Sequence, residues 1–256
     1  MQPIYRPDYT SANHQKYEGG QYLFRGESCY ILSTLVPGRC AAYPHHVHEY
    51  SDQVYYVLSG EMHVQLGSDV HIAGPDTVVF IPRGLPHHNW NEGDQAEHHL
   101  EIFAPSPLPT QPLVTRTDSV DGTGFDYLIR EADPDNYRAA STAGFAMNRV
   151  LQGSDGSEHL SVFVGAVEPA SAGPATHIHA FDQFYYVLEG ELTVQIALDT
   201  HVAPRHSLVR IPSGVPHSQW NAGNLRERHV NLLAPTPKPG EPFDLLVRLE
   251  KLGCVG

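Results

Sequence analysis

The order of hydrophobic and polar residues along the chain predicts short β-strands joined by turns. Gln53 to Leu58 is rich in Val and Tyr, Ser59-Gly60 follows as a turn, and alternation resumes from Glu61 to Leu66. We interpret the two runs as a hairpin with a Gly-containing turn, because β-branched and aromatic residues favour extended backbone. A further run, Thr77 to Ile81, ends at Pro82, which cannot donate to a strand ladder.

Helical periodicity is limited to two short segments. A short helix is predicted around Tyr127 to Ala132, and an amphipathic helix over Phe243 to Leu252, where four leucines would share one side. No apolar run reaches the length of about 18 residues that spans a membrane, so no membrane association is expected. Many short strands with regular turn signals predict an all-β fold, a small sandwich or barrel.

The chain repeats itself at a separation of 130 positions. Asp52 to Glu61 (DQVYYVLSGE) returns as Asp182 to Glu191 (DQFYYVLEGE), and Ile81 to His87 (IPRGLPH) returns as Ile211 to His217 (IPSGVPH). Further matches at the same separation are Trp90-Asn91 with Trp220-Asn221, His99 with His229, and Ala104-Pro105 with Ala234-Pro235. A period of one domain length indicates two domains of one fold, not a solenoid of short repeats.

A stretch from about Ser106 to Thr142, Pro-rich at first and then polar, joins the two copies. We therefore assign residues 1–110 to an N-terminal domain, 111–140 to a linker and 141–256 to a C-terminal domain. The two domains would share one architecture. Association of two chains into a homodimer is also possible.

Composition and charge narrow the classes of partner. The formal net charge is −13, so the basic footprint of a nucleic-acid-binding protein is missing. The chain carries 17 histidines, and histidine is the commonest metal ligand in proteins. Its three cysteines are widely spaced and show no pair motif, and the polar start has no apolar signal region. A cytoplasmic protein that acts on a small molecule is the expected class.

One pattern of metal-ligating residues occurs twice, as His-x-His, then Gln, then a distant His. Residues i and i+2 of a strand point to the same face, so each His-x-His pair can present two imidazoles to one point inside a barrel. The gap before Gln differs by one residue between the copies, so a turn or bulge must lie there, with Gln on a strand beside the histidines. The predicted metal ligands are His46, His48, Gln53 and His87 in the first half and His177, His179, Gln183 and His217 in the second.

Three imidazoles and one amide oxygen leave room on an ion for water or substrate, as catalytic sites do. This donor set suits a divalent transition metal, Fe, Mn, Ni, Co or Zn, at each of two sites, and does not suit Ca or Mg. No catalytic side chain is identified. His45 and His88 should point off the ligand face, and His99 and His229 are either partners behind the ligands or core residues. Tyr55, Tyr185, Trp90 and Trp220 are interpreted as barrel packing.

These residues resemble the two motifs of the cupin superfamily, G-x5-H-x-H-x3,4-E-x6-G and G-x5-P-x-G-x2-H-x3-N. The first is matched from His46 to Gly60 and from His177 to Gly190, and the second from Pro82 to Asn91 and from Pro212 to Asn221. The resemblance implies a bicupin, that is, two double-stranded β-helix (jelly-roll) barrels in one chain. The segments around both motifs are similar to those of quercetin dioxygenase-like cupins.

One departure bears on the chemistry, since Gln53 and Gln183 stand where the superfamily has glutamate. An amide makes the site one charge more positive and cannot take a proton at neutral pH. The leading hypothesis is a metal-dependent, quercetin-dioxygenase-like oxidoreductase for an enol, phenol or hydroxyketone. The amide favours the alternative, a non-oxidative isomerase, cyclase or lyase like the bicupin of bacilysin biosynthesis. A non-enzymatic sensor or storage protein is the third class.

Overall fold

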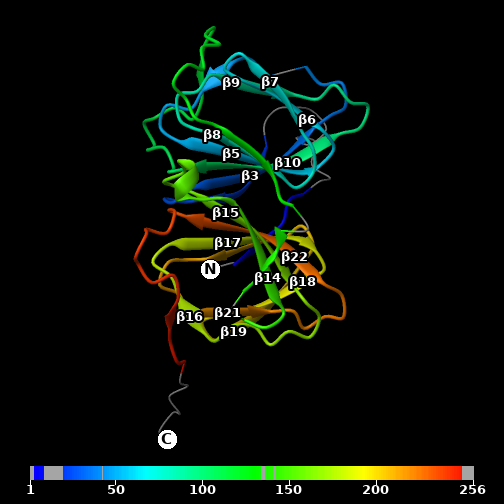
Figure 1. The fold of residues 1–256 in the computed structure, drawn as a ribbon, viewed down its shortest axis with the longest axis vertical. Coiled ribbons are helices and arrows are strands. Elements are labelled where there is room, and N and C mark those ends of the chain that lie inside the picture. The colour runs from blue at the N-terminus through cyan, green and yellow to red at the C-terminus, as the bar shows by residue number, and fades with distance from the viewer. Residues whose placement is uncertain (1–2, 9–19, 42, 134–135, 141, 250–256) are drawn as a thin grey trace, which may run out of the picture.

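The computed structural model describes residues 3–8, 20–41, 43–133, 136–140 and 142–249, and it is built almost wholly of antiparallel strands (Figure 1). The blue-to-green half and the yellow-to-red half of the chain form two barrels, each made of two facing sheets. This confirms the predicted all-β bicupin architecture. In the described residues, no helix is long and apolar enough to cross a membrane.

The first barrel pairs a six-stranded sheet with a five-stranded sheet. In spatial order the larger sheet contains β12 (Leu128–Glu131), β8 (Thr77–Ile81), β5 (Asp52–Ser59), β10 (Glu97–Ala104), β3 (Tyr30–Val36) and β2 (Gln21–Arg25). The smaller sheet contains β11 (Thr115–Arg116), β4 (His46–Val47), β9 (His87–Trp90), β6 (Met62–Leu66) and β7 (Asp69–Ala73).

The second barrel repeats this arrangement with a seven-stranded and a five-stranded sheet. The larger sheet contains β1 (Ile4–Tyr5), β20 (Leu208–Ile211), β17 (Asp182–Glu189), β22 (Glu227–Ala234), β15 (Ser161–Val167), β14 (Phe145–Leu151) and β13 (Arg138–Ala139). The smaller sheet contains β19 (Asp199–Pro204), β18 (Glu191–Ile196), β21 (His217–Trp220), β16 (His177–Ile178) and β23 (Leu245–Leu246).

The strands of the large sheets are buried on both faces. On β5, Tyr55 and Val57 belong to the core inside the first barrel, whereas Val54 and Tyr56 belong to the core shared with the second barrel. Phe24 meets Phe184 across this shared core at a ring-centroid distance of 4.9 Å. Because side chains on both faces of these strands pack into a core, their sequences are continuous runs of hydrophobic residues and do not alternate strictly with polar ones.

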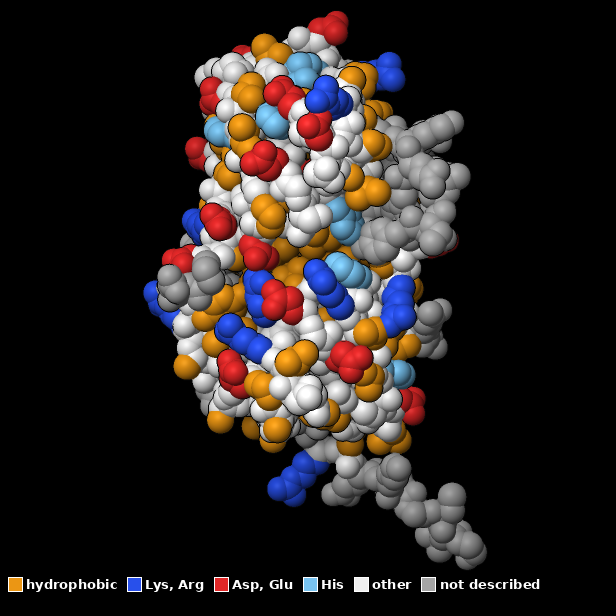
Figure 2. Space-filling model, turned by 90° about the vertical axis from the view of Figure 1, so that its right-hand side faces the viewer, with side chains coloured by type: hydrophobic (Ala, Val, Ile, Leu, Met, Phe, Trp, Pro, Cys, Tyr) orange, Lys and Arg blue, Asp and Glu red, His pale blue; other side chains and the backbone are white. Residues whose placement is uncertain are grey.

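The boundary between the barrels also carries charged contacts. Arg228 of the second barrel is 2.9 Å from Asp76 of the first, and Arg228 is further paired with Glu189. Figure 2 shows hydrophobic side chains that reach the surface between charged ones near the middle of the molecule. The large sheets thus join the barrels back to back and leave the small sheets on the outside.

Three local predictions are wrong. The two runs interpreted as a hairpin do form strands β5 and β6, but β5 pairs with β8 and β10, while β6 pairs with β7 and β9 in the other sheet. The turn at Gly60 carries the chain between sheets. Gly60 has a φ of +78°, and a Cβ there would come within 2.8 Å of the backbone of Ala96 and Glu97, so glycine is required.

Neither predicted helix forms in the described residues, and each segment instead contains a short strand. Leu128–Glu131 pairs with the edge of β8, and Leu245–Leu246 pairs with the edge of β16. In each case a sheet edge supplies backbone partners to a segment too short to hold a helix alone. Residues 250–252 of the second helix lie outside the described residues.

Segments near the start of each repeat are exchanged between the barrels. Ile4 lies opposite Val209 of β20, in the position that Ile129 occupies opposite Val79 of β8 in the first barrel. The range 111–140 likewise contributes β11 and β12 to the first barrel and β13 to the second, so short parts of the expected linker pair with the sheets.

We expect Ile4→Ala, combined with Tyr5→Ala, to lower the free energy of unfolding by about 1–3 kcal/mol, since both side chains are half-buried at the edge of β20. Ile4 packs on the core inside the second barrel, and Tyr5 packs against Phe24. Urea unfolding measures the change. Val70→Ala, on the exposed face of β7, is the control, and an equal loss in both variants would contradict the role of the exchanged segment.

Two candidate metal centres

Three histidines of the first barrel meet at one point. His46 of β4 lies opposite His87 of β9, and the Nδ1 or Nε2 atoms that these two and His48 offer lie within 4.8 Å of one another. The imidazole ring centroids are 4.4–5.1 Å apart. All three side chains are buried. The β4–β9 pairing, which the sequence could not specify, is what brings the distant histidine to the His-x-His pair.

Each of these imidazoles uses its Nδ1 atom to contact a main-chain carbonyl oxygen. The acceptors are Pro44 for His46, at 2.9 Å, Leu113 for His48, and Leu85 for His87, at 2.8 Å. This arrangement assigns the proton to Nδ1 and leaves the lone pair on Nε2, the tautomer suited to metal ligation.

Gln53, the fourth predicted ligand of the first barrel, lies on β5 in the opposite sheet, and not on a strand beside the histidines as predicted. Its Nε2 donates to Glu101 Oε1 at 2.7 Å. Gln53 Oε1, His48 Nε2 and His87 Nε2 are buried and make no hydrogen bond within the described residues. Buried lone pairs without donors are costly unless a cation fills the space, so these residues fit a divalent transition metal.

Burial keeps these imidazoles neutral. It lowers the pKa of His48 from 6.5 to about 4 and lowers the pKa of His87 well below its ordinary value. The neighbouring histidines add to the effect on His87. A neutral imidazole is the form that ligates a metal, so the site is arranged for ligation at neutral pH.

The second barrel repeats the triad with His177, His179 and His217, whose candidate ligand atoms also lie within 4.8 Å of one another. The Nδ1 contacts are to the carbonyl oxygens of Ala175 at 2.7 Å, Phe243 at 2.8 Å and Val215 at 3.0 Å, respectively. Burial lowers the pKa of His217 from 6.5 to about 3.

Gln183 also faces its triad, but its partners differ from those of Gln53. Its Oε1 is 3.0 Å from His217 Nε2, and its Nε2 donates to Asn231 Oδ1 at 3.1 Å. Asn231 therefore stands where the first barrel has Glu101. The sequence interpretation missed this pair. Alignment of the two repeats at a separation of 130 positions would have shown that a charged Glu101 in the first corresponds to a neutral Asn231 in the second.

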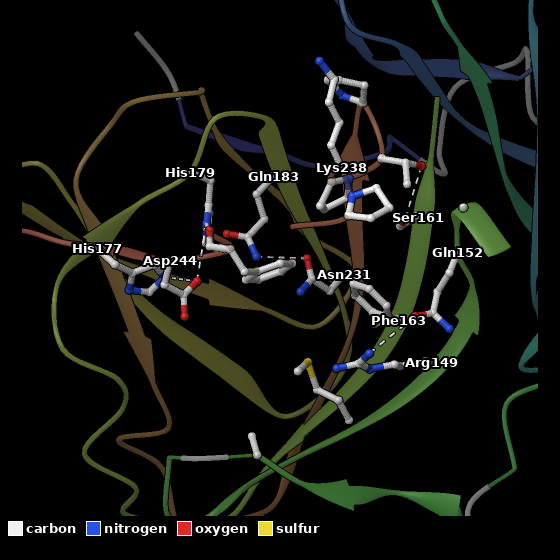
Figure 3. A pocket seen from close by; sticks show the side chains of 18 of the residues that line it. Arg149, Gln152, Ser161, Phe163, His177, His179, Gln183, Asn231, Lys238 and Asp244 are labelled. Carbon is white, nitrogen blue, oxygen red and sulfur yellow. Dashed lines mark hydrogen bonds and ion pairs between the residues drawn. The ribbon is translucent and has the colours of Figure 1, made fainter. Parts of the chain in front are cut away.

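A cavity of about 950 Å³ opens onto the second centre and is lined by His177, His179 and Gln183 (Figure 3). Asp244 reaches the same wall, with Oδ1 3.5 Å from His179 Nδ1 and 4.0 Å from His177 Nε2. Its counterpart 130 positions earlier is Val114. The second centre thus has a partly exposed carboxylate at the cavity that sequence reasoning did not identify.

The outer part of the cavity combines aromatic and cationic groups. The guanidinium of Arg149 lies 5.9 Å from the ring centroid of Phe163 and within 3.5 Å of Gln152. Figure 3 shows Arg149 on the far side of the cavity from His177, whereas the side chain of Lys238 extends away from the other labelled residues. Such a site can hold a planar apolar group and orient a negative charge toward the cations.

The remaining singled-out residues lie outside the two triads. His45 and His88 stack on each other at 3.8 Å, off the ligand face. His99 and His229 are buried with Glu97 and Glu227, which the sequence interpretation did not identify, at 2.9–3.0 Å. Burial alone would lower the pKa of His99, but Glu97 raises it above its ordinary value. Tyr55 and Tyr185 belong to the barrel cores, as predicted.

Comparison with solved structures finds the same fold in proteins of different kinds. The salicylate 1,2-dioxygenase of Pseudoaminobacter salicylatoxidans, with gentisate, has a TM-score of 0.63 and 14% identity over 85% of this chain and 70% of that one. Procruciferin, an 11S globulin of Brassica napus, scores 0.63 at 11% identity over 82% and 77% of the two chains. AerE of Microcystis aeruginosa scores 0.62 at 13% identity over 82% and 90%. At sequence identities this low, the structural similarity establishes the fold alone and not the function.

No curated protein sequence matches this chain. The model of the cupin domain family matches it twice, over residues 31–103 and 163–228, one match in each barrel. Together the two matches cover more than half of the 256 residues. The chain therefore belongs to the cupin family, as a bicupin with a histidine triad in each barrel that could hold a metal ion.

Proposed function

We propose that the protein is a metal-dependent oxidoreductase that acts on a small enol, phenol or hydroxyketone at the centre of the second barrel. The observation that carries this proposal is the cavity of about 950 Å³, because it opens directly onto His177, His179 and Gln183. A cavity of this size accommodates a metabolite, and apolar walls with a few convergent polar groups are typical of small-molecule sites.

In this proposal each triad and its glutamine hold one divalent transition metal, so the ligands are His46, His48, Gln53 and His87, and His177, His179, Gln183 and His217. When bound, such an ion supplies Lewis acidity and an open coordination position. The backbone carbonyls that accept from each Nδ1 fix the direction of the rings. Fe, Mn, Ni, Co and Zn all suit this donor set.

The side chains of the cavity supply binding, orientation and proton transfer. Phe163 and Phe243 exclude water and pack on a planar substrate, while Arg149 attracts its negative group. Gln183 cannot accept a proton, but the Asp244 carboxylate at the same wall can hold one at Oδ1. A substrate that carries an acidic hydroxyl or enol beside a carboxylate would meet all of these groups.

The chemistry of the glutamines favours one alternative, a non-oxidative isomerase, cyclase or lyase. Both centres have an amide where the superfamily motif has a carboxylate, which raises the positive charge that acts on a substrate carbonyl. The fold does not decide between oxidative and non-oxidative chemistry, because proteins of very different function share it, among them a dioxygenase and an 11S globulin.

Oxygen uptake separates these functions. We would load the protein with each candidate metal and supply a panel of enolic and phenolic carboxylic acids, with an oxygen electrode and product analysis as readouts. The proposal expects oxygen consumption in proportion to product and no turnover without oxygen. Undiminished anaerobic turnover would instead support the isomerase or lyase. Tight binding of a panel compound without turnover under either condition would support a sensor.

A further inference from the structure

Each barrel has a position whose side chain accepts a hydrogen bond from the amide of its glutamine, and the two positions carry different side chains. On β10 this residue is Glu101, and at the equivalent place on β22, 130 positions later, it is Asn231. Both accept from the Nε2 of the glutamine, at 2.7 Å in the first barrel and 3.1 Å in the second. The two centres therefore differ by one carboxylate that lies outside the motif residues.

The contacts of Glu101 are those of a carboxylate with both oxygens satisfied. Oε1 accepts from Gln53, and Oε2 accepts from the hydroxyl of Thr34 at 3.3 Å. An acceptor-only group in this place admits one orientation of the glutamine amide, with Nε2 toward Glu101 and Oε1 toward the histidines. Gln53 Oε1 is indeed buried and makes no hydrogen bond within the described residues.

Asn231 imposes no such orientation on Gln183, because an amide can donate as well as accept. In the second barrel the amide oxygen of Gln183 lies 3.0 Å from His217 Nε2. The carboxylate near this centre is Asp244, which lies on the cavity side and is 49% exposed, where water screens its charge.

We propose that Glu101 is a positioning residue that makes the first centre the tighter metal site, so that the first ion is retained while the second, beside the cavity, exchanges. This inference rests on the proposed function, in which both centres hold an ion. The carboxylate fixes the amide oxygen of Gln53 toward the ion and places a half-buried negative charge beside the amide. Partners of this kind, behind the ligands, typically change metal affinity by about 10- to 100-fold.

The test is a Zn(II) titration of metal-free protein against a chelator of known affinity. The wild type should bind two ions with affinities about 10- to 100-fold apart. The variant that lacks His177 and His179 should keep the tighter site alone, which assigns it to the first barrel. Glu101→Asn, which copies the second barrel, should weaken that site by a similar factor and leave the weaker site unchanged.

The reciprocal variant Asn231→Glu should strengthen the second site, which tests the inference even if Glu101→Asn fails to fold. Glu101→Gln, of nearly the same shape, separates the carboxylate from simple packing and should also weaken the first site. Equal affinities in the wild type, or an unchanged first site in a folded Glu101 variant, would overturn the inference alone. Fewer than two ions bound to the wild type would remove the proposed metal function and this inference with it.

Discussion

Replacing His177 and His179 together by alanine is expected to reduce the metal content from two ions to one and to abolish turnover. In the proposed site the two imidazoles would supply two of the four donors, and removing them would leave only His217 and Gln183, too few protein ligands for a divalent ion. Elemental analysis of the purified protein gives the metal content. The cavity opens onto this centre, so activity should fall below detection.

The matched change in the first barrel is His46→Ala with His48→Ala. It should also remove one ion, but its effect on turnover should be smaller than that of the second-barrel change. His45→Ala with His88→Ala is the control, because these two histidines lie beside the ligands in sequence yet stack on each other off the ligand face. Unchanged metal content in either ligand variant would reject the assignment for that barrel, and a loss in the control would show that any histidine change disturbs the fold.

The metal-free protein should lose stability steeply as the pH falls from about 6.5 to about 4. Burial lowers the pKa of His48 to about 4 and of His217 to about 3, against 6.5 in the unfolded chain. Above pH 6.5 these groups are neutral in both states and cost nothing. Below it, protons bind the unfolded chain more readily than the folded one, so the free energy of unfolding falls until the folded pKa values are reached.

For His48 the full effect is about 3 kcal/mol, and for His217 it is of the same order. Urea unfolding of the metal-free protein at several pH values measures the slope. His48→Gln, which stays neutral at every pH, should flatten the dependence between pH 6.5 and 4.5, a range above the ordinary pKa values of carboxyl groups. A variant whose slope equals that of the wild type would show that His48 is not held neutral in the fold.

The sequence by itself determined the class of fold, its duplication and the residues of both triads. The repeat at 130 positions is strong evidence for two domains of one fold, because the second copy keeps the spacing of turns, strands and predicted ligands of the first. A His-x-His pair also fixes its own geometry, since alternate residues of an extended chain share a face. Those inferences need only local backbone geometry or the comparison of one half of the chain with the other.

Only the tertiary structure decided which strands pair, and with them the surroundings of each centre. The run after Gly60 looks like the second strand of a hairpin, but it joins the opposite sheet, because pairing depends on non-local hydrogen bonds that a local pattern does not encode. The predicted helix at 127–132 became an edge strand for the same reason. Glu101, Asn231 and Asp244 carry no motif, so their roles emerge only where folding brings distant segments together.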